Sequence, residues 1–205
     1  MSTSKPVHDN ETVPFTQQQV AVIESARQSI CQRGMKKTTM LALANDMGIS
    51  RQTLYRTFEN RDELLAIIYT SEFDKAVTGS LTKTLQSPKF EQAVAESVLL
   101  AITLVDENPI LRDMMLGTGA PWFQTQILDR RSLLHRKLMD FGDRLWRPQL
   151  TTARKKKQLK DTLSDTDIVE WLLSNHYLTM VRPAETRDHH IEMLRKFVIP
   201  ALLKT

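Results

Sequence analysis

The chain has 205 residues, enough for one or two domains, and carries a formal net charge of +4. Hydrophobic residues make up 41% and charged residues 25%, as in ordinary soluble globular proteins. The single cysteine, Cys31, excludes an internal disulfide and any site built from several cysteines, and it fits a cytoplasmic location. No apolar run approaches the roughly 20 residues of a membrane span, so we expect no membrane contact. The mildly basic charge permits a nucleic-acid partner without establishing one.

The N-terminal part begins with a polar stretch and a helix. Residues 1–14 lack the apolar core of a signal peptide and are predicted to form a disordered tail. Thr16 can cap a first helix, and Phe15 directly before it is a possible staple partner for Val20. Gly34 is expected to end this helix in a left-handed conformation.

Two short helices and one long helix follow. A hydroxyl at Thr38 or Thr39 can cap the second helix, which Gly48 ends. Ser50 caps the third helix, and a fourth is expected over residues 61–85. The apolar residues recur every three or four positions throughout, and no stretch alternates with period two, so an all-α fold of about nine helices is predicted.

The rest of the chain continues the helical pattern. Ser87-Pro88 and Asn108-Pro109 each supply a cap followed by proline at the first helical position. Five further helices are expected, over residues 89–106, 109–117, 122–146, 165–181 and 186–203. The lysine-rich residues 154–157 are interpreted as a solvated loop or a frayed helix end.

Residues 38–58 have the pattern of a helix-turn-helix. Ala44 is small enough for two helices to approach closely, and Gly48 permits the sharp turn between them. Ile49 and Leu54 are expected to face inward and fix the crossing of the helices. Ser50 leaves the first turn of the third helix free to project outward.

The outward side chains suit a helix lying in the major groove of DNA. They belong to Arg51, Gln52, Thr53, Tyr55 and Arg56. Arginine can bond guanine, glutamine can bond adenine, and the threonine methyl can pack on thymine. Tyr55 and Thr57 suit phosphates, although Tyr55 could instead pack on the fourth helix. The competing interpretation of the whole segment is a helical hairpin with a solvated charged face, and Lys36 and Lys37 are equally compatible with phosphate contacts and plain solvation.

From about Phe15 to Tyr69 the sequence resembles the tetracycline-repressor (TetR/AcrR) family of bacterial transcriptional regulators. The shared features are Gly34, Thr38-Thr39, Leu43-Ala44, Gly48-Ile49-Ser50, Thr53-Leu54-Tyr55-Arg56, Phe58, Arg61 and Leu64-Leu65. The resemblance implies base contacts from Arg51, Gln52 and Thr53. It implies phosphate contacts from Thr39, Tyr55, Thr57 and Arg61. The complete set of candidate DNA-binding residues is Thr38, Thr39, Ser50, Arg51, Gln52, Thr53, Tyr55, Arg56, Thr57 and Arg61.

Two positions depart from the family pattern. The family often has histidine where Thr57 stands, which puts the strength of one phosphate contact in doubt. It often has glycine where Gln52 stands, which indicates more side-chain readout here. The predicted domains are a helix-turn-helix DNA-binding domain over residues 15–62 and a regulatory and dimerisation domain over residues 63–205.

The resemblance also implies a homodimer formed through the last two long helices. Each of these helices has an apolar face that could pair across a two-fold axis or simply pack on its own subunit. The candidate interface residues are Ile168, Trp171, Leu172, Leu178, Ile191, Leu194, Phe197, Val198 and Leu202.

An inducer pocket in the regulatory domain is a further implication of the resemblance. Apolar, aromatic and flexible side chains suit a hydrophobic ligand, although any one of them could be plain core. The candidates are Leu99, Thr103, Met114, Met115, Trp122, Phe123, Leu134, Leu138, Trp171 and Tyr177. His135 and His176 are possible polar anchors.

Three functional hypotheses follow. The first is a repressor that binds a palindromic double-stranded DNA operator and is released by a small, largely hydrophobic effector. The second is a DNA-binding regulator without such an effector, controlled by a protein partner. The third, an enzyme, is disfavoured because the sequence has no Gly-rich phosphate loop, no Gly-x-Ser-x-Gly and no His-Glu-x-x-His. No cofactor and no metal site is expected.

Overall fold

The computed structural model describes residues 14–84, 87, 89–182 and 186–204. Within these ranges every regular element is a helix, apart from one isolated β-bridge between Leu159 and Leu203. The predicted all-α fold is therefore confirmed. The tail expected over residues 1–14 lies outside the described residues except for its last one. Among the described helices, none combines the length and the apolar character that crossing a bilayer requires.

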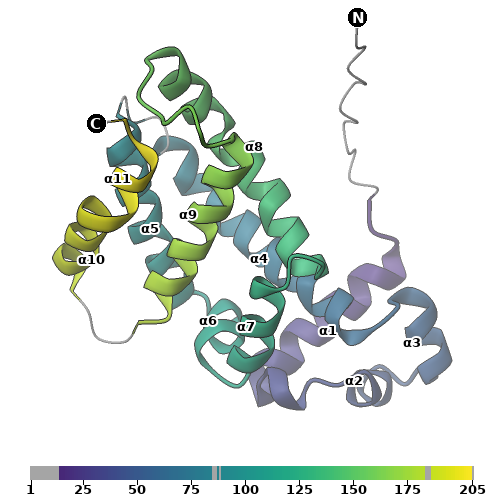
Figure 1. Ribbon diagram of the computed structural model, residues 1–205. Coiled ribbons are helices and arrows are strands. Elements are labelled where there is room, and N and C mark those ends of the chain that lie inside the picture. Colours follow the sequence, from purple (N-terminus) through teal and green to yellow (C-terminus); the bar gives the residue numbers. More distant parts are fainter. Residues whose placement is uncertain (1–13, 85–86, 88, 183–185, 205) are drawn as a thin grey trace, which may run out of the picture.

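The N-terminal helices gather at one end of the molecule (Figure 1). They are α1 (Gln17–Arg33), a 3₁₀ turn (Met35–Lys37), α2 (Met40–Asp46), α3 (Arg51–Thr57) and the first turns of α4 (Arg61–Thr84). The predicted caps of the first three helices are present. Thr16 forms a capping box with Gln19, and the hydroxyls of Thr39 and Ser50 accept from the backbone N–H groups of Ala42 and Thr53.

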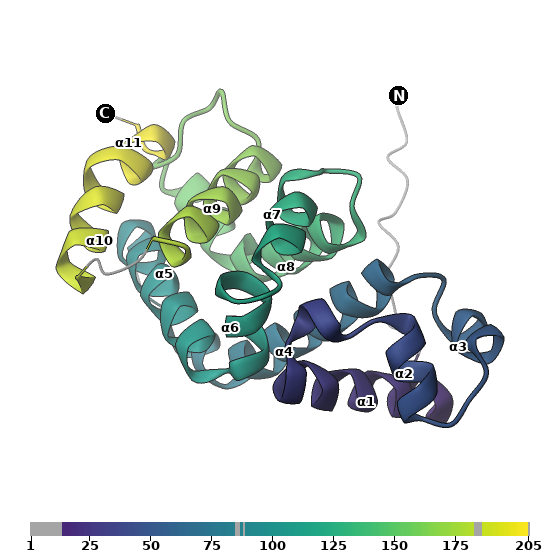
Figure 2. The same cartoon turned by 90° about the horizontal axis from the view of Figure 1, so that it is seen from below.

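The C-terminal helices build the larger part of the molecule. They are α5 (Phe90–Glu107), α6 (Pro109–Leu116), α7 (Ala120–Leu128), α8 (Leu133–Lys155), α9 (Asp165–Met180), α10 (Arg187–Met193), a π-helical turn (Leu194–Val198) and α11 (Ile199–Leu202). Figure 2 shows α3 and α10 near opposite ends, with α4 to α9 between them. The long helix α4 connects the two regions.

Two hydrophobic clusters form the core. The first joins α1 to α4 with α6, α7 and the start of α8, and it includes Leu54, Phe58, Leu111 and Phe123. The second joins α5, α8, α9 and the C-terminal helices. The first cluster crosses the predicted domain boundary near residue 62, so the DNA-binding region and the regulatory helices share apolar packing.

The expected single helix over residues 122–146 is wrong: two helices, α7 and α8, occupy this region. Ser132 separates them, because its hydroxyl caps α8 at the N–H of His135, 2.9 Å away, and donates to the carbonyl of Gln126 at 2.5 Å. The expected end before Pro148 is also wrong, since α8 continues to Lys155. Burial of Trp146 and Leu150 on either side of the proline holds the helix together.

Two C-terminal expectations also differ from the structure. The helix α5 begins at Phe90, after Lys89 rather than after a Ser87 cap. Packing fixes this start, because the Phe90 ring lies 6.0 Å from that of Trp146. The last expected helix is interrupted by the π-helical turn just before Pro200, which lacks a backbone N–H.

Candidate DNA-binding surface and ligand cavity

The turn between α2 and α3 has the geometry that the sequence predicts. Gly48 has a φ of +63°, in the region that favours glycine. The N–H of Ile49 donates to the carbonyl of Ala44 at 3.0 Å and closes the turn. Leu54 and Phe58 are buried, so α3 is held from behind by apolar contacts.

The opposite face of α3 is open to solvent. Arg51, Gln52 and Arg56 are exposed, and Tyr55 is 44% exposed, which argues against its packing on α4. Thr53 is half-buried, and its hydroxyl lies 2.9 Å from that of Ser50. The side chains of α3 that can reach a base edge are therefore the exposed ones, Arg51, Gln52, Tyr55 and Arg56.

Thr38 does not belong to this open surface. It is 1% exposed, its hydroxyl lies 2.7 Å from that of Ser29, and it donates to the carbonyl of Gly34 at 3.1 Å. The expected DNA contact of this side chain is therefore wrong. Thr39, the next residue, is exposed and caps α2.

Arg61 has a structural task. Its guanidinium donates to the carbonyls of Thr38 at 2.8 Å and Met35 at 2.6 Å. Burial lowers the pKa of Arg61, while the neighbouring Asp62 carboxylate acts in the opposite direction. The side chain is half-buried, so a phosphate contact would have to use what remains of its exposed edge. Thr57 is also half-buried and donates to the carbonyl of Thr53.

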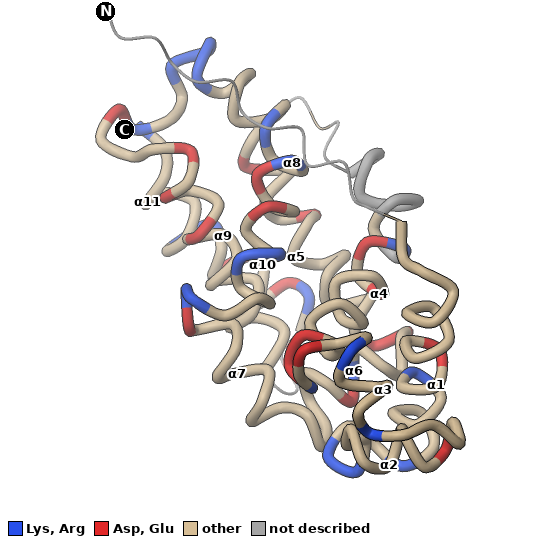
Figure 3. The backbone as a smooth tube through the Cα atoms, turned by 90° about the vertical axis from the view of Figure 1, so that its right-hand side faces the viewer, with Lys and Arg blue, Asp and Glu red and all other residues tan. Residues whose placement is uncertain are grey.

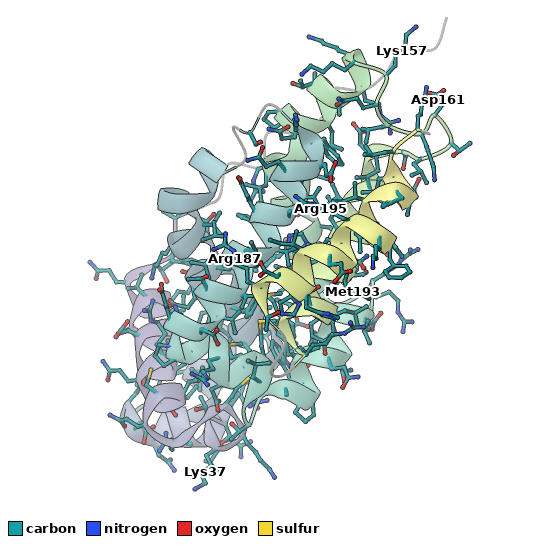
Figure 4. The ribbon with its side chains drawn as sticks, turned by 90° about the vertical axis from the view of Figure 1, so that its left-hand side faces the viewer. Lys37, Lys157, Asp161, Arg187, Met193 and Arg195 are labelled. Carbon is teal, nitrogen blue, oxygen red and sulfur yellow. The ribbon has the colours of Figure 1, made fainter. Side chains whose placement is uncertain are left out.

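Basic residues lie around α2 and α3 (Figure 3). Lys36 and Lys37 are exposed in the 3₁₀ turn, whereas Arg33 forms an ion pair with Asp46. The lysine-rich end of α8 lies far away, as the labels of Lys37 and Lys157 show (Figure 4). The interpretation of residues 154–157 as solvated is wrong for Arg154, which is half-buried in the last turn of α8, pairs with Asp165 and donates to the carbonyls of Lys160 and Leu163. Lys155, Lys156 and Lys157 are exposed.

A cavity of about 70 Å³ lies among α4, α5, α8 and α9, with one contribution from α7. Its walls are mainly apolar and aromatic. The lining residues are Tyr69, Phe73, Ser97, Ala101, Ile127, Leu138, Phe141, Gly142, Leu145, Trp146, Val169, Leu173, His176 and Met180.

His176 and Ser97 form the polar spot in this wall. The Nδ1 atom of His176 lies 2.6 Å from the carbonyl oxygen of Leu172, and its Nε2 atom lies 2.9 Å from the Ser97 hydroxyl. Burial lowers the pKa of His176 to about 4, so the imidazole is neutral at pH 7. A neutral ring that donates from Nδ1 can only accept at Nε2, so the single proton of the Ser97 hydroxyl is directed either to this nitrogen or to the carbonyl oxygen of Val94, 2.8 Å away. The other candidate anchor, His135, is buried away from the cavity with its Nδ1 atom 2.7 Å from the carbonyl oxygen of Ile127.

Of the ten residues expected to line a pocket, only Leu138 lines this cavity. Met115, Phe123 and Tyr177 lie behind the side chains that line the cavity. The Tyr69 hydroxyl donates to the Met115 sulfur at 3.2 Å, and the Phe123 ring lies 4.7 Å from that of Tyr69 and 5.7 Å from that of Tyr177.

The other six expected lining residues lie elsewhere. Met114 and Leu134 are buried in the first core cluster. Leu99 is half-buried, and Thr103 and Trp171 are exposed. Trp122 donates from its indole N–H to the Asp62 carboxylate at 2.8 Å. The aromatic lining residues Phe73, Phe141 and Trp146 were missed; the spacing of Tyr69 and Phe73 by one helical turn was the available signal.

The candidate dimer residues separate into two groups. Ile168, Leu172, Leu194, Val198 and Leu202 are buried in the second core cluster. Their expected role in a dimer interface is wrong, because they already pack within their own subunit. Trp171, Leu178 and Phe197 are 42%, 51% and 62% exposed, and Ile191 is half-buried. A homodimer through this second group stays a prediction.

The geometry thus defines a helix-turn-helix DNA-binding unit joined to a helical domain with an internal cavity. The sequence model of the family described as "Bacterial regulatory proteins, tetR family" matches residues 22–68. This match assigns the helix-turn-helix region, residues 22–68, to that family of regulatory proteins. No curated protein matches it.

Solved structures share the fold along most of the chain. A TetR-family regulator from Shewanella sp. PV-4 has 15% identity and a TM-score of 0.58, with 93% of this chain and 100% of that chain covered. One from Marinobacter aquaeolei VT8 has 14% identity and a TM-score of 0.52, covering 91% and 96%. The TetR-family repressor AlkX from Dietzia sp. strain DQ12-45-1b has 18% identity and a TM-score of 0.53, covering 92% and 97%.

Proposed function

We propose that this protein is a transcription repressor that binds a palindromic operator as a homodimer and is released by a small, largely hydrophobic effector. The observation that carries the proposal is the solvent-exposed face of α3, where Arg51, Gln52 and Tyr55 project from a helix anchored by Leu54 and Phe58. These side chains can read bases and bind phosphates in a major groove.

A dimer supplies the second recognition helix. Two such helices must lie about 34–36 Å apart to enter successive major grooves on one side of the duplex. The apolar side chains of Trp171 and Leu178 on α9 and of Phe197 in the π-helical turn remain exposed, so they are available for a contact between two copies.

The cavity supports a small-molecule effector over a protein partner. Its aromatic walls and single polar pair, His176 with Ser97, resemble the composition of ligand sites. An effector releases DNA only if it binds one arrangement of the two regions more tightly than the other. The shared core cluster gives such an arrangement a physical connection to α1 and α4.

The recognition face can be tested by selecting duplexes from a random DNA library with the full chain and measuring affinity by fluorescence anisotropy. Arg51→Ala and Gln52→Ala should each weaken binding by about 5- to 150-fold, the equivalent of about 1–3 kcal/mol for one base contact. Arg131→Ala is the matched control, because this arginine is exposed in the turn between α7 and α8. Unchanged affinity in both α3 variants would contradict the assignment.

A further inference from the structure

The cavity adjoins a second hollow on the surface. A groove of about 340 Å³ lies between α4 and α8, which run side by side in Figure 1. We call the cavity the inner compartment and this groove the outer compartment. Phe73, Leu138 and Phe141 line both. The rings of Phe73 and Phe141 meet edge to face with centroids 5.4 Å apart, so these rings and the Leu138 side chain stand at the boundary that the compartments share, and a ligand that spans both must displace them.

The inner compartment fits a narrow apolar group. At about 70 Å³ it has about half the volume of the engineered 150 Å³ protein cavity that takes up benzene. An alkyl chain is slender enough to enter such a space, whereas a ring requires more room. The wall offers aromatic and aliphatic contacts, and its polar pair is already satisfied within the protein.

The outer compartment is polar and electrically balanced. Lys137 and Arg144 supply two positive charges, and Asp74 and Asp140 supply two negative charges. A charged group placed among them meets repulsion as well as attraction, so the groove favours neither an anion nor a cation. An uncharged head group that hydrogen-bonds can use either kind of side chain.

Phe15 brings the DNA-binding unit into this groove. It directly precedes Thr16, the N-cap of α1, and it lines the outer compartment opposite residues of α4 and α8. Its side chain is 47% exposed, so contact surface remains for a ligand. A molecule in the groove therefore contacts the residue before the start of α1 as well as the helices α4 and α8.

We propose that the two compartments form one site for a linear amphiphile, with its alkyl chain in the inner compartment and its uncharged polar head in the outer compartment against Phe15. This inference rests on the proposed function and specifies its effector. A ligand in the groove changes the contacts of Phe15. Because Phe15 directly precedes the N-cap of α1, this change can shift the position of α1.

The ligand class is tested with three probes of equal chain length, 1-octanol, octanoate and octyltrimethylammonium, titrated calorimetrically into the full chain. The alcohol should bind at least about tenfold more tightly than either charged probe. From 1-hexanol to 1-octanol the affinity should rise about three- to fourfold per methylene, as expected for burial of each group. Absent binding of the alcohols, or tighter binding of a charged probe, overturns the proposal.

The role of Phe15 is tested with Phe15→Ala, which removes an exposed side chain outside the helix. It should weaken octanol binding about fivefold or more and reduce octanol-induced release of selected DNA. Val20→Ala is the matched control, because Val20 is 53% exposed on the first turns of α1 and does not line the groove. Equal effects of the two variants, or no effect of Phe15→Ala, contradict the proposed contact.

The inner compartment is tested with Ala101→Leu and the smaller change Ala101→Val, which fill it from α5. Octanol affinity should fall at least about tenfold in the leucine variant and less in the valine variant, with DNA affinity unchanged. If the alcohols do not bind while the wild-type protein still binds selected DNA, only the ligand inference fails. If the wild-type protein binds no DNA, the proposed function fails.

Discussion

Arg61 and Thr38 join the start of α4 to the turn that precedes α2. The arginine donates to two backbone carbonyls, those of Met35 and Thr38, and the threonine hydroxyl joins the loop to Ser29 on α1. These bonds fix the frame that presents α3, so the two side chains serve DNA binding through position.

Replacing Arg61 should therefore lower the free energy of unfolding, because its main role is structural. Arg61→Ala leaves two part-buried carbonyls without their donor, and the free energy of unfolding in urea should fall by about 1–3 kcal/mol. Arg56→Ala is the control, since that exposed side chain should change stability by less than about 0.5 kcal/mol while it weakens DNA binding. Equal stabilities of the two variants would contradict this structural task.

His176 makes stability depend on pH. Its pKa is about 4 in the folded chain and about 6.5 when unfolded, so the unfolded chain binds more protons between these values. The contribution of neutral His176 to the free energy of unfolding is complete above pH 6.5 and is lost as the pH falls toward 4. The total loss is on the order of 1–3 kcal/mol.

The measurement is chemical denaturation from pH 7 to pH 4 with wild-type protein and His176→Gln. The variant should lose less stability over this window, because it lacks the buried imidazole. His189→Gln, a change at an exposed histidine, should follow the wild-type curve. Parallel curves for all three proteins would show that His176 titrates normally.

At the scale of elements, α6 is tied to the DNA-binding unit at the 3₁₀ turn. The Asp113 carboxylate accepts from the N–H of Met35 at 2.7 Å and from the N–H of Thr118 at 3.1 Å. The N–H of Lys36 in turn donates to the Thr118 hydroxyl at 3.1 Å. The end of α6 and the turn after it are thereby fixed to the residues that lead into α2.

Asp113→Ala should loosen this connection. The backbone N–H groups of Met35 and Lys36 should exchange with solvent at least about tenfold faster, since the carboxylate holds the first directly and the second through Thr118. Hydrogen exchange measured by NMR reports each amide separately. Asp106→Ala, at an exposed position on α5, provides the comparison, and identical exchange in both variants would refute the connection.

At the scale of the whole molecule, the exposed apolar residues of α9 and the C-terminal helices bear on the assembly. A charge on the predicted contact should separate the subunits, so Phe197→Glu is expected to shift the protein to monomers in sedimentation velocity and to weaken DNA binding at least about tenfold. Leu116→Glu is the matched control, because Leu116 is 43% exposed at the end of α6, a helix that packs against α1, α4, α5 and α7. A dimer that survives Phe197→Glu would place the interface elsewhere.

The all-α fold and the helix-turn-helix could be predicted from the sequence because their signals are local. Thr16, Ser50 and Asn108 act as caps within three residues of themselves, and Gly48 sets a turn through its own φ. Ser87 had the same pattern and failed, since packing of Phe90 against Trp146 starts α5 later. A local signal predicts an element only where no stronger tertiary contact competes.

The sequence alone determined the all-helical fold and the outward face of α3, since periodicity and capping act over one or two helical turns. Only the tertiary structure decided which apolar side chains line the cavity, which fill the core and which stay exposed. Phe123 and Phe141 are the same residue type, yet Phe123 packs behind the cavity and Phe141 lines it. Such differences depend on the rotation and crossing of helices that are distant in sequence, and a one-dimensional pattern does not contain them.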